Sequence, residues 1–411
     1  MIKAQRGTKD IFGEESITWQ WITNSAQKVF QNAGYQEIKT PRFEATELFA
    51  RGVGDSTDIV NKEMYTFSVV GADKNATSIT LRPENTAGVV RAYIEHNLNR
   101  QSPPQKFWYF GPMFRYERPQ AGRQRQFHQI GVEMFGVSQA SADAEVIMSA
   151  VEFLKTLGLG DLEVELNSLG CPKCKDDYRA KIKAVLKPHL DNLCDDCKMS
   201  YEKNPLRILD CKDENCQKIF ELDEVKKVIL NDYICDECKE HFETLTSYLD
   251  ELNIKYKRNK LLVRGLDYYN RTVFEIKSSA LGSQSAVCGG GRYDGLVEML
   301  GGTPTPAVGF AMGVERLYSL VEKKDVQKLD YFIVSTDTKQ AIKLAQKLRQ
   351  QNKKVEFDMQ ARKFAKQLEK ASKVAKFAII LGEDEIVQGF YSVKNLETGE
   401  QKRIDKMEDL I

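Results

Sequence analysis

The chain has 411 residues, of which 42% are hydrophobic and 29% charged, and its formal net charge is +1. This length indicates two or three domains, and the composition is that of an ordinary globular protein. A charge so close to zero excludes a general attraction to nucleic acid or membranes, so any polyanion site must be a local patch. No run is apolar enough to span a bilayer, and the first residues lack the apolar segment of a signal peptide. We therefore expect a cytoplasmic protein with no membrane partner.

The first predicted elements are a helix and a strand. Apolar residues recur at helical spacing over residues 14–33, and Gly34 ends the pattern. Residues 34–44 have a short strand pattern that contains Pro41, which places this strand at a sheet edge or an interface. The helix and strand suit a dimer contact, although a plain edge strand is an open alternative.

Residues 78–97 predict a strand, a loop and a helix, with Thr86 as the expected N-cap. Glu84 precedes the start of this helix. Its carboxylate can favour the helix dipole or bind an ammonium group. From this stretch alone, we favour the capping role.

Residues 107–135 predict a long antiparallel hairpin around a turn-rich loop at 118–123. Because side chains alternate along a strand, the second strand divides into two faces. One face carries Phe127, Gln129, Gly131 and Glu133, and the other carries His128, Ile130, Val132 and Met134.

The polar face of this hairpin predicts the floor of a ligand site rather than a half-solvated sheet. Phe127 can stack on a planar ligand, and Gly131 lets a ligand approach the backbone. Arg115 lies near the loop, where its planar guanidinium suits a phosphate.

After the hairpin we expect a helix at 141–157 and a strand at 161–167. The composition then becomes rich in Lys, Asp and Cys, which predicts an inserted helical module. A strand at 272–277 belongs to the first domain again. The predicted organisation is a catalytic domain in two parts, 1–170 and 261–325, an insertion at 171–260, and a C-terminal domain at 326–411.

Eight of the nine cysteines form close pairs within the insertion. Three pairs have the Cys-x-x-Cys spacing and one is wider: Cys171/Cys174, Cys194/Cys197, Cys235/Cys238 and Cys211/Cys216. Two pairs can build one tetrahedral zinc site, so four can build two. Each structural zinc would contribute roughly 10–16 kcal/mol to folding. Free thiols in a reducing compartment are the alternative, and Cys288 is expected to be a packed thiol.

Two further stretches carry local signals. Residues 289–291 are three glycines without a P-loop ending, and they allow the backbone to approach a ligand. Residues 307–313 predict a strand that runs into a helix, and Arg316 lies in the first turn of that helix. A cation there opposes the helix dipole unless an anion binds.

A lysine-rich linker near residue 325 precedes a small α/β domain. Strands are expected at 331–335, 354–358 and 377–381, helices at 338–350 and 361–375, and a hairpin turn at 397–400. Lysines line one face of the second helix, at Lys363, Lys366, Lys370 and Lys373. A solvated face is the favoured interpretation, and nucleic-acid contact is the alternative.

Taken together, these motifs resemble the bacterial histidyl-tRNA synthetases, which are class II aminoacyl-tRNA synthetases. Residues 34–44 resemble the first class motif, 114–133 the second and 309–316 the third. Residues 264–269 (Arg-Gly-Leu-Asp-Tyr-Tyr) and 290–294 (Gly-Gly-Arg-Tyr-Asp) resemble motifs of the histidine enzymes, and residues 6–10 resemble their N-terminal signature. Gly13 and Asn85 depart from the family pattern, which more often has proline and glycine there.

The resemblance implies an α+β fold. Its parts are an antiparallel catalytic sheet of six-stranded type, a Cys-rich helical insertion and a C-terminal α/β anticodon-binding domain. It also implies a homodimer that joins L-histidine to its tRNA through a histidyl-adenylate, using ATP with Mg²⁺.

The resemblance also implies roles for individual residues. Arg115 and Arg264 would be catalytic, on either side of the α-phosphate. ATP would contact Arg115, Glu117, Arg123, Phe127 and Arg316. Histidine would contact Glu84, Asn85, Thr86, Gln129, Glu133, Arg264, Tyr268, Tyr269 and Tyr293. The loop at 118–124 would face the tRNA acceptor end, and the C-terminal domain the anticodon.

Two alternatives stay open on the sequence alone. One is a regulatory paralogue that binds histidine without activating it, which Arg264 and the tail at 331–411 disfavour. The other is an RNA-binding or sensor module on the same sheet. Histidine-dependent exchange of pyrophosphate into ATP separates the three functions.

Overall fold

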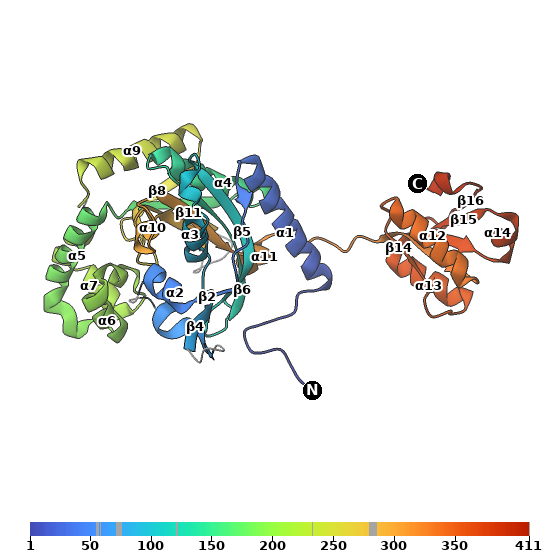
Figure 1. Ribbon diagram of the computed structural model, residues 1–411, viewed down its shortest axis with the longest axis horizontal. Coiled ribbons are helices and arrows are strands. Elements are labelled where there is room, and N and C mark those ends of the chain that lie inside the picture. Colours follow the sequence, from blue (N-terminus) through green and yellow to red (C-terminus); the bar gives the residue numbers. More distant parts are fainter. Residues whose placement is uncertain are drawn as a thin grey trace. The chain divides into compact units, whose positions relative to one another are not determined.

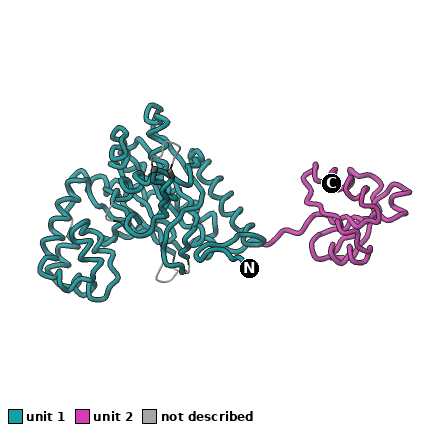
Figure 2. Tube along the Cα trace, turned by 60° about the horizontal axis from the view of Figure 1, so that its bottom comes forward, with its two compact units in different colours: residues 1–324 teal, residues 325–411 magenta. Residues whose placement is uncertain are grey.

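The computed structural model describes residues 1–54, 57, 59–70, 76–120, 122–231, 233–278 and 286–410. The chain forms two compact units, residues 1–324 and residues 325–411 (Figure 2). Among the described residues, the helices are all too short or too polar to cross a membrane.

An eight-stranded sheet forms the centre of the first unit, in the order β1-β5-β6-β11-β10-β9-β7-β8. Its six inner strands are all antiparallel to their neighbours, and β1 and β8 each add a parallel edge. The strands are β1 (Gln36–Glu37), β5 (Gln105–Phe114), β6 (Gln126–Phe135), β7 (Leu162–Ser168), β8 (Tyr256–Arg258), β9 (Asn270–Ser278), β10 (Ala286–Arg292) and β11 (Ala307–Gly313). The predicted catalytic sheet is therefore confirmed.

The β5–β6 hairpin pairs in register from Gln105↔Phe135 to Phe114↔Gln126. The alternation along β6 separates two environments, as predicted. Ile130, Val132 and Met134 enter a hydrophobic core shared with the helices on that side. These helices are α1 (Gly13–Asn32), α4 (Ala140–Thr156), α9 (Asp236–Glu251) and α11 (Val314–Leu320), and they are seen in Figure 1.

The opposite face of the sheet is only partly covered. α3 (Thr86–Glu95) packs Val89 and Tyr93 against Phe107 and Tyr109 of β5. Four short helices or turns and a small three-stranded sheet complete this side. The helices and turns are α2 (Thr46–Val53), the π-helix η1 (Ile59–Glu63), the 3₁₀ turn η2 (Leu98–Arg100) and α10 (Leu296–Met299), and the small sheet has the strand order β2 (Phe43–Ala45), β4 (Ala76–Leu81), β3 (Tyr65–Val70). The part left open is the cavity described below.

The Cys-rich helices form a cluster at one end of the unit (Figure 1) with a hydrophobic core of their own that includes Leu186, Ile208 and Phe220. They are α5 (Pro172–Leu186), η3 (Lys187–Asn192), α6 (Asp195–Lys203), η4 (Pro205–Asp210), α7 (Glu214–Phe220) and α8 (Asp223–Ile229).

The stretch predicted as the insertion, residues 171–260, also contains two elements that serve the sheet. In α9, Leu245 and Leu249 join the core of the first unit, and β8 pairs in parallel with β7. Composition placed these elements in the insertion because α9 has the same abundance of charged residues and cysteines as the helices before it.

The second unit has a five-stranded sheet in the order β13-β12-β14-β15-β16. β12 lies parallel to both β13 and β14, and β15 and β16 form the terminal hairpin. Its elements are β12 (Leu329–Ser335), α12 (Thr338–Gln350), β13 (Val355–Phe357), α13 (Phe364–Val374), β14 (Ala375–Leu381), α14 (Glu383–Gln388), β15 (Tyr391–Asn395), β16 (Gln401–Ile404) and η6 (Met407–Leu410). The short helix α14 was not predicted.

The lysines of α13 are engaged within the second unit. Lys366 and Lys373 lie 2.8 and 3.1 Å from the carboxylate of Glu369, and Lys370 lies 3.4 Å from that of Glu356. These exposed pairs fit a solvated helix face, the interpretation favoured from sequence.

Candidate active site

A cavity of about 330 Å³ opens on the uncovered face of the first unit's sheet. Its floor is β6, β10 and β11, and its walls are the start of α3, the loop after β5, and residues 264–269. Nearly all the predicted ligand contacts line it: Glu84, Thr86, Arg115, Glu117, Arg123, Phe127, Gln129, Glu133, Arg264, Tyr268, Tyr269 and Arg316. Segments more than two hundred residues apart in sequence meet at this cavity.

Four arginines line the cavity. Arg264 forms an ion pair with Glu275, and the other three form the basic part of the cavity. Glu117 lies between two of them, with its carboxylate 3.7 Å from Arg115 and 3.5 Å from Arg123. The guanidinium of Arg115 lies 5.2 Å from the centre of the half-buried Phe127 ring, so a planar group and a cation lie side by side in the cavity lining. This arrangement suits a ligand with an aromatic base and phosphates.

Arg316 is the third of these arginines. It projects from the first turn of α11, and its guanidinium donates to the carbonyl of Ala286 at 2.7 Å. Burial and the positive charge of Arg123 lower the pKa of Arg316. An anion bound between Arg123 and Arg316 would relieve their repulsion. The unfavourable position of Arg316 in the first turn of a helix led to the same expectation of an anion site.

Glu133 forms the acidic part of the cavity and is only 1% exposed. Thr86 donates its hydroxyl to this carboxylate at 2.7 Å, and the Tyr293 hydroxyl also donates to it. Burial raises the pKa of Glu133 to about 8, so this group is largely protonated at neutral pH.

Glu84 caps α3, which confirms the role favoured from the sequence. Its carboxylate accepts from the backbone N–H of Thr86 at 2.7 Å and of Ala87 at 2.9 Å. The prediction of Thr86 as the N-cap is wrong, because Asn85 occupies that position and Thr86 is the first helical residue. The Thr86 hydroxyl is thereby free to reach Glu133, and Glu84 still borders the cavity.

Two predicted histidine contacts lie behind the cavity lining. Asn85 is 1% exposed, and its amide oxygen accepts from the Thr40 hydroxyl at 2.6 Å and from Arg82 at 3.0 Å. Tyr293 reaches Glu133 from the core. Both side chains are buried and outside the cavity lining, so they act on the cavity through the residues that they contact. The amide nitrogen of Asn85 has no partner among the described residues.

Two buried side-chain polar atoms of the lining have no partner among the described residues. They are the amide oxygen of Gln129 and the Nε of Arg264, and both are buried. Buried polar atoms are rarely left unpaired in native proteins. A ligand that carries an ammonium and a carboxylate would satisfy an acceptor and a donor of this kind.

The glycines of the floor make room for side chains of the protein, which corrects the expectation that they admit a ligand to the backbone. A Cβ at Gly131 would collide with the Tyr109 hydroxyl, and one at Gly289 with the Arg264 guanidinium. A Cβ at Gly309 would collide with the Glu133 carboxylate. The glycines are needed because large polar side chains cross the sheet surface at these points. At Gly131 and Gly309, a Cβ would also collide with a backbone carbonyl of the neighbouring strand.

The sequence reasoning missed two carboxylates in the lining. Glu275 on β9 forms an ion pair with Arg264. Glu315 on α11 accepts from the backbone N–H of His128 at 3.0 Å. Alternation along the predicted strand at 272–277 is the signal that could have found Glu275, because Phe274 and Ile276 face the core on either side of it.

Comparisons with known proteins identify the family to which this chain is related. The family described as Histidyl-tRNA synthetase matches residues 7–317, and the Anticodon binding domain matches residues 325–411. The chain belongs to the histidyl-tRNA synthetase family. The histidine–tRNA ligase of Caldanaerobacter subterraneus subsp. tengcongensis is 48% identical over 422 residues, covering 100% of this chain and 99% of that one. That of Halothermothrix orenii is 48% identical over 412 residues, covering 98% and 96%.

A solved structure of this synthetase family has the same fold. The apo histidyl-tRNA synthetase of S. aureus is 36% identical, with a TM-score of 0.80, and the match covers 98% of this chain and 97% of that one. A Bacillus halodurans protein titled ATP phosphoribosyltransferase regulatory subunit/histidyl-tRNA synthetase is 22% identical, with a TM-score of 0.66, which shows a shared fold only.

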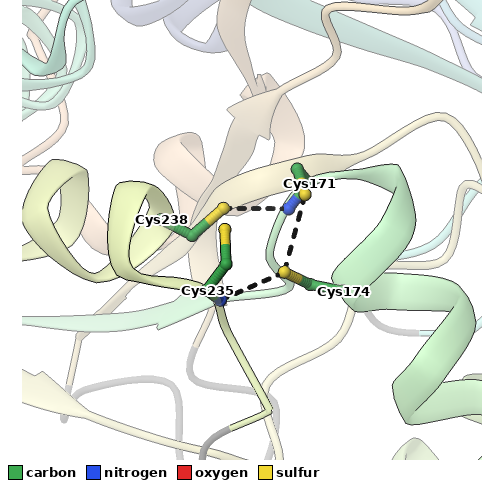
Figure 3. Close-up of side chains that lie close together, drawn as sticks. All are labelled: Cys171, Cys174, Cys235 and Cys238. Carbon is green, nitrogen blue, oxygen red and sulfur yellow. Dashed lines mark hydrogen bonds between the residues drawn. The ribbon is translucent and has the colours of Figure 1, made fainter.

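Away from the synthetase cavity, the eight paired cysteines gather into two clusters of four. Cys171 and Cys174 meet Cys235 and Cys238, and their sulfur atoms converge in Figure 3. The second cluster consists of Cys194, Cys197, Cys211 and Cys216. Within each cluster all sulfur atoms lie within 4.8 Å of one another.

The two clusters have a common design. In both, the N–H of the first cysteine donates to the sulfur of the last, from Cys171 to Cys238 at 3.1 Å and from Cys194 to Cys216 at 3.3 Å. The sulfur atoms of Cys171 and Cys174 are 3.5 Å apart, and those of Cys194 and Cys211 are 3.8 Å apart. In a tetrahedral site with Zn–S bonds of about 2.3 Å, neighbouring sulfur atoms are about 3.8 Å apart, so both distances suit zinc. Four sulfur ligands with N–H donors around them suit a structural zinc.

Proposed function

We propose that this chain activates L-histidine with ATP and transfers the histidyl group to its tRNA. Relatives named histidine–tRNA ligase match the whole chain at 48% identity. The observation that carries the proposal is the cavity itself. It combines four arginines, a half-buried aromatic ring, a buried acid and a buried amide oxygen that lacks a partner.

In the first step, the histidine carboxylate attacks the α-phosphate of ATP. Two anions must approach each other, so cations have to stabilise the charge that develops. Arg115 and Arg264 do this from the hairpin and from residues 264–269. Arg123 and Arg316 hold the pyrophosphate that leaves, and Mg²⁺ enters with the ATP phosphates. Phe127 stacks on adenine, and Glu117 accepts from its amino group.

Recognition of histidine uses the acidic side of the cavity. Glu84, Thr86 and Gln129 bind the ammonium group, and the free amide oxygen of Gln129 supports this role. Glu133 and Tyr269 bind the imidazole, which always has at least one N–H to donate. Tyr268 closes the pocket, while Tyr293 and Asn85 act through the residues that they position.

Histidine-dependent exchange of pyrophosphate into ATP tests this function. The full chain should support exchange with histidine and not with other amino acids. Arg264→Ala should lower the rate by about 10²–10³, the effect of losing one donor that stabilises developing charge. Arg100→Ala, at an exposed arginine, is the matched control and should retain exchange. Exchange driven equally well by another amino acid would reject the specificity.

We also propose that each cysteine cluster binds one zinc ion. Two equivalents of zinc per chain are expected in protein purified without chelator. Cys216→Ser should remove one equivalent, and Cys288→Ser, at a buried cysteine outside both clusters, should remove none. Less than about a tenth of an equivalent in the wild-type chain would reject zinc binding.

The remaining proposals concern location and partners. We infer a cytoplasmic homodimer, supported by the edge position of β1 and by Phe43, which is 57% exposed. Sedimentation should give the mass of two chains. The second unit contacts the anticodon, and the loop at 118–124, of which Ala121 lies outside the described residues, contacts the acceptor end.

A further inference from the structure

We propose that the Cys-rich insertion positions the histidine-binding residues 264–269, and that zinc in its two clusters thereby sets the affinity for histidine. This inference rests on the proposed function and names a form of control for the same cavity. It makes the insertion a part of the amino-acid site, although the eight clustered cysteines lie outside the cavity lining.

The histidine loop, residues 264–269, supplies Arg264, Tyr268 and Tyr269 to the cavity. It belongs to a stretch, residues 259–269, that is neither helix nor strand. The backbone groups of such a stretch depend on contacts from other segments to keep one conformation. The position of three ligand-contacting side chains therefore depends on what holds this loop.

Lys175 holds the loop from the first cluster. Its ammonium group donates to the carbonyls of Asp267 and Tyr269, both at 2.8 Å, and the residue is 9% exposed. Lys175 directly follows Cys174, whose sulfur accepts from the N–H of Cys235 at 3.2 Å. A displacement of Cys174 would therefore move the ammonium group that fixes two carbonyls of the loop.

Asn204 and Arg207 hold the same loop beside the second cluster. Asn204 donates to the Asp267 carboxylate at 2.7 Å, and Arg207 donates to the Gly265 carbonyl at 2.5 Å. Arg207 lies in η4, and the N–H of Cys211 closes the last turn of η4 onto Ile208 at 3.1 Å. Residues next to each cluster therefore form hydrogen bonds to the same loop, Lys175 beside the first cluster and Asn204 and Arg207 beside the second.

Zinc would determine whether these contacts persist. Four thiolates within 4.8 Å repel one another unless a cation neutralises them, and without the metal only weak thiol contacts fix their positions. The ATP-binding residues Arg115, Arg123 and Phe127 come from the β5–β6 hairpin and its loop, which have no cysteine. Loss of zinc should therefore weaken histidine binding and leave ATP binding nearly unchanged.

The first experiment compares the zinc-loaded full chain with the same chain depleted by chelator and then reloaded. Equilibrium dialysis measures the Kd of histidine and of ATP separately. We expect the histidine Kd to rise about tenfold or more on depletion, as for loss of buried hydrogen bonds to a binding loop, and to recover on reloading. The ATP Kd should stay within about twofold. An unchanged histidine Kd in the depleted chain would overturn the proposal.

The second experiment leaves the cysteines intact. Lys175→Met should retain two zinc ions, raise the KM for histidine about tenfold and leave the KM for ATP unchanged. Lys173→Met is the matched control, because Lys173 adjoins Cys174 on the other side and is exposed. Arg207→Ala should act in the same direction as Lys175→Met. Hydrogen exchange should become faster in residues 264–269 of both loop variants and not in the control.

These outcomes separate this proposal from the ligase activity. Zinc-dependent histidine binding without any pyrophosphate exchange would reject the ligase activity and still support the coupling. Exchange with an unaltered histidine KM in Lys175→Met and Arg207→Ala would retain the ligase activity and overturn the coupling.

Discussion

At the scale of single residues, Glu133 is the most informative group of the cavity. Burial is the main reason that its pKa rises to about 8, and the hydroxyls of Thr86 and Tyr293 offset only part of this effect. The folded chain therefore binds a proton here that the unfolded chain releases near its ordinary value. The contribution of Glu133 to folding stability accordingly becomes less favourable as the pH rises from about 4.5 to about 8.

The same shift predicts how histidine binding depends on pH. Above about pH 8, Glu133 becomes a carboxylate that can accept from the imidazole N–H, so the Kd of histidine should fall as the pH rises toward that value. Equilibrium dialysis at constant ionic strength measures this dependence. Glu133→Gln has no such titration and serves as the control for the titration of histidine itself. Identical pH profiles for the two proteins would contradict the prediction.

At the scale of elements, the site depends on how close β11 lies to β6. Gly309 pairs with Glu133 in register, and a side chain at Gly309 would occupy the space of that carboxylate. Three neighbouring strands contribute glycines of this kind. Glycine at these positions leaves room on the sheet surface for polar side chains of the protein. This need explains why glycine occurs in these strands, although it lowers intrinsic strand stability.

A substitution of this glycine tests that interpretation. Gly309→Ala should cost about 1–3 kcal/mol of unfolding free energy through overpacking and should also weaken histidine binding. Gly295→Ala is the control, because nothing lies within 4 Å of a Cβ at that position. Denaturant unfolding measures the first effect and dialysis the second. A Gly309→Ala chain as stable as the control would contradict this prediction, because a Cβ there would also collide with the backbone carbonyl oxygen of Val132.

At the scale of the whole molecule, the chain divides into two compact units with separate hydrophobic cores. The cavity and both cysteine clusters belong entirely to residues 1–324. The second unit matches the Anticodon binding domain from its first residue to its last. Activation of the amino acid and recognition of the tRNA are thus expected to use different units.

This division predicts the behaviour of a shortened chain. A protein that ends at Lys324 should keep histidine-dependent pyrophosphate exchange within about tenfold of the full chain, because every described residue of the cavity is present. The same protein should lose most of its ability to charge tRNA. Both activities are measured on one preparation, with far-UV circular dichroism as the check on folding. Equal loss of both activities would contradict the separation.

The sequence by itself determined much of the local structure and the sorting of faces. β11 and α11 meet at the predicted junction between Gly313 and Val314, and β6 turns Ile130 and Val132 to the core while Gln129 and Glu133 face the cavity. Such features follow from the periodicity of neighbouring residues, which a single strand or helix already specifies.

Only the tertiary structure decided which distant residues meet. It placed the pair Cys171/Cys174 beside Cys235/Cys238 rather than beside the nearer pair Cys194/Cys197, and brought Glu275 to Arg264. It also filled the space above Gly131 with Tyr109 instead of a ligand. Spacing along the chain does not determine these contacts, because they arise when separate elements pack against one another and compete for the same space.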